Sequence, residues 1–268
     1  MRTLLKVGAS LLLLAFVLIG LSYSMLRAHG SSTASVAGRD LESETRPVDG
    51  GVDVIDLNGP IDLTLRQGEA ARLEVKGEQR LLANIDTSSS GDTLHIGTTG
   101  MLLYHRQPIQ VVLTLPALRE LHVRGDGDST VNGFSGDAIE VRMEGRGTLK
   151  FNGRFSEVNA IVRGTGEVEM NGGASGKVEA TVEGSGTLTV VGSARELKAV
   201  LAGSGELNAQ HLKAASVDLT MMGSGSAAVN ATRRLEATLR GTGDIDVYGA
   251  PATREVNING SGTVDYKD

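Results

Sequence analysis

The chain has 268 residues, 36 of them glycine, with a net charge of −6 at pH 7 and neither cysteine nor tryptophan. The acidic balance disfavours nucleic-acid binding, which needs a basic face, and the lack of cysteine excludes disulfides, thiolate metal sites and a lipidated N-terminal cysteine. Because only 3% of residues are aromatic, the core must consist of small and branched aliphatic side chains, and β-branched residues favour strands over helices.

Residues 1–26 carry the pattern of a signal peptide or signal anchor. Arg2 and Lys6 precede the uncharged run Val7–Leu26, and a basic start followed by an apolar stretch is typical of export signals. The run is 20 residues long, enough to span a bilayer as a helix, so cleavage and retention as an inner-membrane anchor both remain open. We therefore expect an exported chain, placed in the periplasm or on the cell surface.

Residues 27–45 are polar and rich in serine, and this composition predicts a linker. Residues 46–120 contain alternating apolar and polar stretches without a fixed period, which are typical of short strands. We expect them to form irregular N-terminal coils and a cap, because a stack of repeats needs an atypical first turn to cover its open end. The segment 100–110 interrupts this pattern and is interpreted as a lid, with a contact surface as the alternative.

Residues 121–268 contain a Gly-x-Gly triplet that recurs every 18 to 20 residues. A fixed period of this size indicates repeats that stack on their neighbours. Apolar residues stand two and four positions before every triplet, so each repeat is expected to hold two short strands with one buried face. The proposed corner glycines are Gly125, Gly127, Gly145, Gly147, Gly164, Gly166, Gly184, Gly186, Gly203, Gly205, Gly223, Gly225, Gly241, Gly243, Gly260 and Gly262.

These patterns predict an all-β protein, a right-handed parallel β-helix with coils of about 19–20 residues. Both glycines of a triplet permit positive φ and hence a tight corner between two sheets, and the lack of a Cβ lets successive corners stack. The second corner of each coil is looser, marked by Asn132-Gly133, Asn152-Gly153 and Asn171-Gly172. Variable loops are where a solenoid usually forms its binding surface.

Charge alternation from repeat to repeat supports this stacking. The residues directly before four successive triplets alternate in sign: Arg124, Glu144, Arg163 and Glu183. Asp126 and Arg146 stand inside two neighbouring triplets and carry opposite charges. Since like charges on adjacent strands are destabilising, the alternation predicts that consecutive repeats are neighbours in space.

No catalytic, cofactor-binding or metal-binding residues are assigned. The histidines are dispersed and form neither an H-E-x-x-H motif nor a pair four residues apart: His29, His95, His105, His122 and His211. Glu167, Glu206 and Asp244 are expected to share one face, but no lysine or arginine recurs beside them, as a lyase-like site would need.

Three sequence segments, followed by successive Gly-Ser-Gly repeats, resemble the head GIN domain family. Its bacterial members are described as autotransporter adhesins. The segments are GPIDLTLRQGE (59–69), LLANIDTSSSGDTLHI (81–96) and PIQVVLTLPALRELHVRGDG (108–127), and the resemblance covers residues 46–266. It implies a β-helix similar to pectin-lyase-like solenoids, without their catalytic residues, and an adhesive role. As no barrel or stalk sequence follows Asp268, we expect a head domain that does not secrete itself.

The predicted function is that of an exported cell-envelope binding or adhesion module without catalysis, with a surface protein or glycan as its ligand and no cofactor. Two alternatives remain: a lyase-like carbohydrate-active enzyme that uses a groove of the β-helix, and a structural envelope protein anchored through Val7–Leu26. Homo-oligomers are also considered, because unpaired solenoid ends invite self-association.

Overall fold

The computed structural model describes residues 40–100 and 108–267. The expected signal or anchor segment, most of the linker and residues 101–107 of the expected lid lie outside the described residues. Within the described ranges, no helix is both long and apolar enough to cross a membrane.

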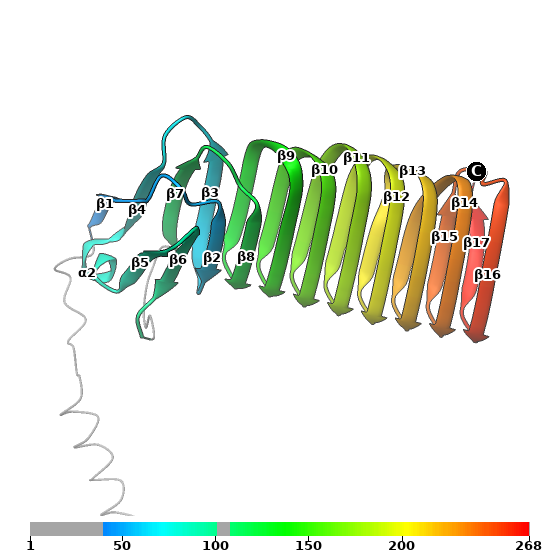
Figure 1. Ribbon diagram of the computed structural model, residues 1–268. Coiled ribbons are helices and arrows are strands. Elements are labelled where there is room, and N and C mark those ends of the chain that lie inside the picture. The colour runs from blue at the N-terminus through cyan, green and yellow to red at the C-terminus, as the bar shows by residue number, and fades with distance from the viewer. Residues whose placement is uncertain (1–39, 101–107, 268) are drawn as a thin grey trace, which may run out of the picture. The chain divides into compact units, whose positions relative to one another are not determined.

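The described residues form strands and one short helix (Figure 1). In chain order they are β1 (Leu41–Arg46), β2 (Val54–Asn58), β3 (Ile61–Gln67), β4 (Arg72–Glu78), α2 (Gln79–Leu82), β5 (Ile85–Ser90), β6 (Thr93–Thr98), β7 (Ile109–Leu115), β8 (Glu120–Gly125), β9 (Asp128–Gly145), β10 (Thr148–Gly164), β11 (Glu167–Gly184), β12 (Thr187–Gly203), β13 (Glu206–Gly223), β14 (Ser226–Gly241), β15 (Asp244–Tyr248), β16 (Thr253–Gly260) and β17 (Thr263–Lys267).

The regular part is a parallel β-solenoid, as the repeat predicts. Strands β9 to β14 each run from one Gly-x-Gly corner to the next, and each pairs in parallel with the following coil. The two strands expected per repeat are thus joined through the second corner into one long strand. The first glycines of successive triplets lie opposite one another in seven pairings, from Gly125–Gly145 to Gly241–Gly260.

Aliphatic side chains stack in columns inside the solenoid. One column runs through Val141, Ala160, Ala180, Ala199, Leu219 and Ala237, and each of these residues is at most 1% exposed. Because the side chains of a strand alternate between its faces, every second residue is buried and the residues between them point to solvent. Burial of these columns removes apolar surface from water, at roughly 25 cal/mol per Å².

The two glycines of a corner are needed for different reasons. Gly203, the first of its triplet, has φ +125°, a conformation that side chains rarely adopt. Gly205, the second, lies outside the positive-φ region, but a Cβ there would meet the carbonyl oxygen of Gly186 in the preceding coil at 2.6 Å. The expectation of positive φ therefore applies to the first glycine, whereas close backbone approach constrains both.

Ion pairs connect neighbouring coils as the charge alternation predicts. Arg163 contacts Glu144 of the preceding coil at 3.3 Å and Glu183 of the following coil at 2.8 Å. Arg146 contacts Asp126 at 3.0 Å. These pairs are exposed, so each contributes little to stability, but together they are consistent with one register of stacking.

The N-terminal end has a different strand order from the chain order. Strand β2 pairs in parallel with both β6 and β8, and β3 pairs in parallel with both β7 and β9. The coil formed by β2 and β3 therefore lies between the β6–β7 coil and the regular repeats. Antiparallel strands complete this end: β5 pairs with β6, β4 with β7, and β1 with β4.

Two local expectations differ from the structure. Strand β1 begins at Leu41, inside the segment 27–45 expected as a linker. It is an exposed edge strand without apolar alternation, held through Arg46, which donates to the carbonyl oxygen of Leu82 at 2.7 Å. Residues 46–120 are expected to hold only short strands, but Gln79–Leu82 form the helix α2, which the antiparallel hairpin β5–β6 follows.

Substitution of Gly203 by alanine tests the corner geometry. The new Cβ would lie 2.3 Å from the carbonyl oxygen of Gly184 at φ +125°, and we expect a loss of about 2 kcal/mol or more in the free energy of unfolding. Thermal and urea denaturation measure this. Gly50→Ala is the control, since a Cβ at Gly50 has no atom within 4 Å; equal stability of both variants would contradict the corner model.

Reversal of one charge tests the ion-pair column. Glu183 lies between Arg163 and Ala202, whereas Glu206 lies between Thr187 and Ser226. We expect Glu183→Arg to lower the melting temperature more than Glu206→Arg at low salt, because only the first places two arginines side by side. The difference should shrink as salt screens the repulsion, and an identical response of the two variants would argue against the pairing.

Candidate functional site

The second corner of each coil is where the solenoid departs from regular pairing. The register shifts there in all five pairings from β9 to β14, for example between Asn171 and Gly173 in the pairing of β11 with β12. The Gly-x-Gly corners, by contrast, keep their register. Residues at the second corner are thus less constrained by the repeat, and a depression of about 510 Å³ there is lined by Gly133, Asn152, Gly153 and Asn171 among others. Two further depressions lie on the strand segments that follow this corner.

Two adjoining depressions form what we call the corner groove. They have volumes of about 250 and 640 Å³ and share Glu157 and Lys177. Together they extend from the residues before β8 to β13. The lining residues are Arg119, Glu120, Ala138, Ile139, Glu140, Ser156, Glu157, Val158, Asn159, Gly176, Lys177, Glu179, Arg195, Glu196 and Ser216.

The corner groove carries cations that are held in their charged form. Lys177 contacts Glu179 at 2.7 Å, and the hydrogen bond with Glu179, together with the negative charges of Glu179, Glu196 and Glu157, raises the pKa of Lys177. At one end, hydrogen bonding to Asp53 and nearby carboxylates raise the pKa of Arg119. The groove therefore presents fixed positive charges between carboxylates.

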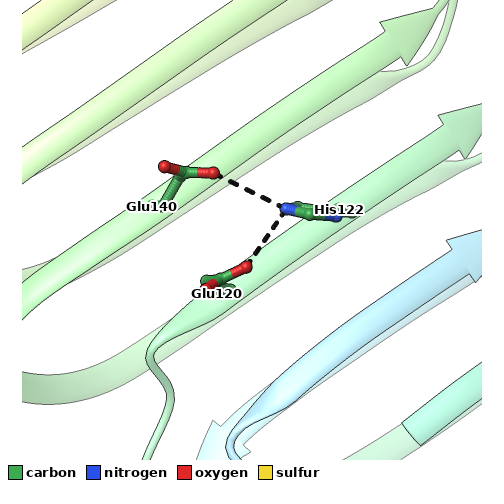
Figure 2. A group of neighbouring side chains, drawn as sticks. All are labelled: Glu120, His122 and Glu140. Carbon is green, nitrogen blue, oxygen red and sulfur yellow. Dashed lines mark ion pairs between the residues drawn. The ribbon is translucent and has the colours of Figure 1, made fainter. Parts of the chain in front are cut away.

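A group of polar side chains at one end of the groove consists of Glu120 and Glu140, which line the groove, and the neighbouring His122. Glu120 and His122 are two residues apart on β8, so they project from the same face, and Glu140 lies beside Glu120 in the next coil, on β9 (Figure 2). His122 Nε2 is 3.5 Å from Glu120 Oε2 and 3.7 Å from Glu140 Oε1. We call these three residues the His122 cluster.

Neighbouring side chains fix both carboxylates of the His122 cluster. Arg119 Nη1 lies 3.0 Å from Glu120 Oε1, and Asn159 Nδ2 donates to Glu140 Oε2 at 3.0 Å. Arg142 contacts Glu140 Oε1 at 2.5 Å. His122 Nε2 is shielded from solvent and has no hydrogen-bond partner, although the side chain as a whole is 26% exposed.

The His122 cluster was not predicted from the sequence, because its histidine and two glutamates come from two different repeats. The pattern that could have found it is Glu-x-His at 120–122 followed by Glu140 one repeat later. His95 instead pairs with Asp56 at 3.2 Å, and His211 is exposed. His29 and His105 lie outside the described residues. Glu167, Glu206 and Asp244 do share a column, but Thr187 and Ser226 separate them.

Residues 52–251 match the family model described as "Putative auto-transporter adhesin, head GIN domain". A comparison with curated proteins gave no match.

The structure is similar to several solved structures. A putative adhesin from Parabacteroides distasonis has 25% identity over 85% of this chain and 97% of that chain, with a TM-score of 0.80. A protein from the same species, described as a putative lipid binding protein, has 21% identity over 85% and 97% of the two chains and a TM-score of 0.78. A putative adhesin from Parabacteroides merdae has 23% identity over 85% and 97%, with a TM-score of 0.68. The last two likenesses show the fold alone.

Proposed function

This chain belongs to the head GIN domain family of putative auto-transporter adhesins, and on that premise we propose that it is an exported, non-catalytic binding module with an adhesive role at the cell envelope. The observation that carries the proposal is the corner groove, which crosses several coils on the strand segments that follow the second corner. The buried columns serve the fold, whereas the groove residues differ from coil to coil and are available for recognition.

The chemistry of the corner groove favours a ligand with charged groups. Its lining contains Arg119, Lys177 and Arg195 together with several glutamates, and it contains no aromatic side chain. A neutral glycan is usually bound by stacking on aromatic rings, which this lining does not offer. We therefore favour an extended polypeptide or a charged glycan, whose groups would form ion pairs and hydrogen bonds along the groove.

The lyase-like enzyme remains the alternative, because the groove does bring Lys177 close to Glu157 and Glu179. A lyase needs a base that accepts a proton near neutral pH. The carboxylates raise the pKa of Lys177, which makes it a poorer base. We expect no reducing or unsaturated ends when the full chain is incubated with mixed acidic polysaccharides; their appearance, and their loss in Lys177→Met, would favour the enzyme.

Export can be tested by protease digestion of intact and permeabilised producing cells. If the chain is a surface adhesin, protease should digest it on intact cells. Protection until the envelope is permeabilised would place it in the periplasm and contradict adhesion to other cells. N-terminal sequencing of the same chain distinguishes a cleaved signal from an anchor at Val7–Leu26.

Charge reversal in the groove tests the binding surface. We expect that proteins or charged glycans captured from an array by the full chain will bind Lys177→Glu about tenfold more weakly, because the reversal replaces an attractive charge in the groove by a repulsive one for an acidic ligand. Lys150→Glu is the matched control, because Lys150 pairs with Glu169 at 3.2 Å outside the groove. Equal binding by both variants would exclude the groove as the contact surface.

A further inference from the structure

The separations within the His122 cluster do not fit hydrogen bonds. His122 Nε2 lies 3.5 and 3.7 Å from the two carboxylate oxygens, whereas N–H···O bonds in proteins span about 2.7–3.2 Å. This nitrogen is nevertheless shielded from solvent and makes no hydrogen bond. The two contacts lie at ion-pair distance, and a shielded imidazole nitrogen that faces two carboxylates without a hydrogen bond to either is also a candidate metal ligand.

The separations do fit the ligand spacing of a tetrahedral metal ion. Zinc binds histidine nitrogen at about 2.0–2.1 Å and carboxylate oxygen at about 2.0–2.2 Å, which at tetrahedral angles places two ligand atoms about 3.4 Å apart. All three donor atoms of the cluster lie within 4.8 Å of one another. We propose that Glu120, His122 and Glu140 form a site for a divalent transition-metal ion, with zinc as the best fit, on the outer face of β8 and β9.

The donor types select the class of metal. Imidazole nitrogen suits zinc, copper and nickel, whereas magnesium and calcium prefer sites made of oxygen ligands alone. Two carboxylates balance the double positive charge of the ion. Three protein ligands leave a fourth tetrahedral position for water.

The surroundings of the cluster resemble the outer shell of a metal site. Arg119 and Asn159 engage the outer oxygens of Glu120 and Glu140, so the carboxylates are held in place, and such partners commonly orient metal ligands. Glu120 and Glu140 also line the corner groove, so the carboxylate side of the cluster is open to solvent.

Arg142 competes with the ion, because it contacts the same oxygen of Glu140 that would bind the metal. Zinc binding therefore requires Arg142 to share that oxygen or to turn away. This gives a specific consequence: removal of the Arg142 charge should strengthen metal binding, whereas it would have no such effect on adventitious binding elsewhere.

The site shares Glu120 and Glu140 with one end of the corner groove, but its test needs no groove ligand. The ligands come from two successive coils, so the ion would cross-link β8 to β9 at the start of the regular repeats. Because an ion that binds only the folded state stabilises it, zinc should raise the resistance of this part of the solenoid to unfolding, whether or not the corner groove has a ligand.

The experiment is a zinc titration of the metal-free full chain, with a chromophoric chelator as competitor and thermal denaturation as the second readout. We expect one equivalent of zinc to bind and to raise the melting temperature. His122→Ala and Glu140→Gln should each weaken this binding at least about tenfold, because the loss of even an outer-shell partner commonly costs about 10–100-fold, and Arg142→Gln should strengthen it.

His211→Ala is the control, since His211 is exposed and lies far along the chain on β13. Circular dichroism before titration establishes that each variant is folded. No zinc binding by the parent chain, or equal binding by His122→Ala, Glu140→Gln and His211→Ala, would overturn the proposal.

Discussion

The solenoid depends on the close approach of backbone to backbone at its Gly-x-Gly corners. At Gly223 a Cβ would lie 2.1 Å from the carbonyl oxygen of Gly203 one coil earlier, which no L side chain tolerates. The same closeness lets the amide of the residue after each first glycine donate across the coils, as Ser224 does to Gly203 at 3.0 Å. Since the corner has one geometry in every coil, it sets the register of the two strand segments that flank it.

Once the corners fix the register, the roles of the other positions follow. Inward positions form columns of small aliphatic side chains, which suits a chain with few aromatics, and outward positions are free to vary. Register shifts occur at the second corner, and the corner groove lies on the strand segments that follow it. The glycine corners and the buried columns thus hold the fold, and the outward positions of the groove are the ones that our proposal assigns to binding. At the last coil, Val256, Ile258 and Tyr266 are 38–43% exposed.

Stacking also determines which polar residues meet. Residues one repeat apart become direct neighbours, so Arg163 meets two glutamates from adjacent coils, and His122 meets Glu140. Such contacts recur along the outer face, but their chemistry depends on the side chains at each step. Arginine between two carboxylates gives a surface ion pair, whereas histidine between two carboxylates gives a donor set suited to a metal ion. The corner groove and the His122 cluster both form because residues one repeat apart become neighbours in space.

The sequence by itself determined the repeat, the parallel stacking, the Gly-x-Gly corners and the ion pairs of Arg163 and Arg146, because each depends on a period that is visible along the chain. It also indicated the second corner as the variable one. Only the tertiary structure decided the N-terminal end, where β2 and β3 lie between strands that follow them in the chain, and where β1 and β5 lack any apolar pattern. The corner groove and the His122 cluster are also visible only in the tertiary structure, because side chains from different repeats form them. The local sequence pattern indicates which face of a strand a residue occupies. The distance between side chains in different coils depends instead on the register of the strands, which is set only when the coils stack.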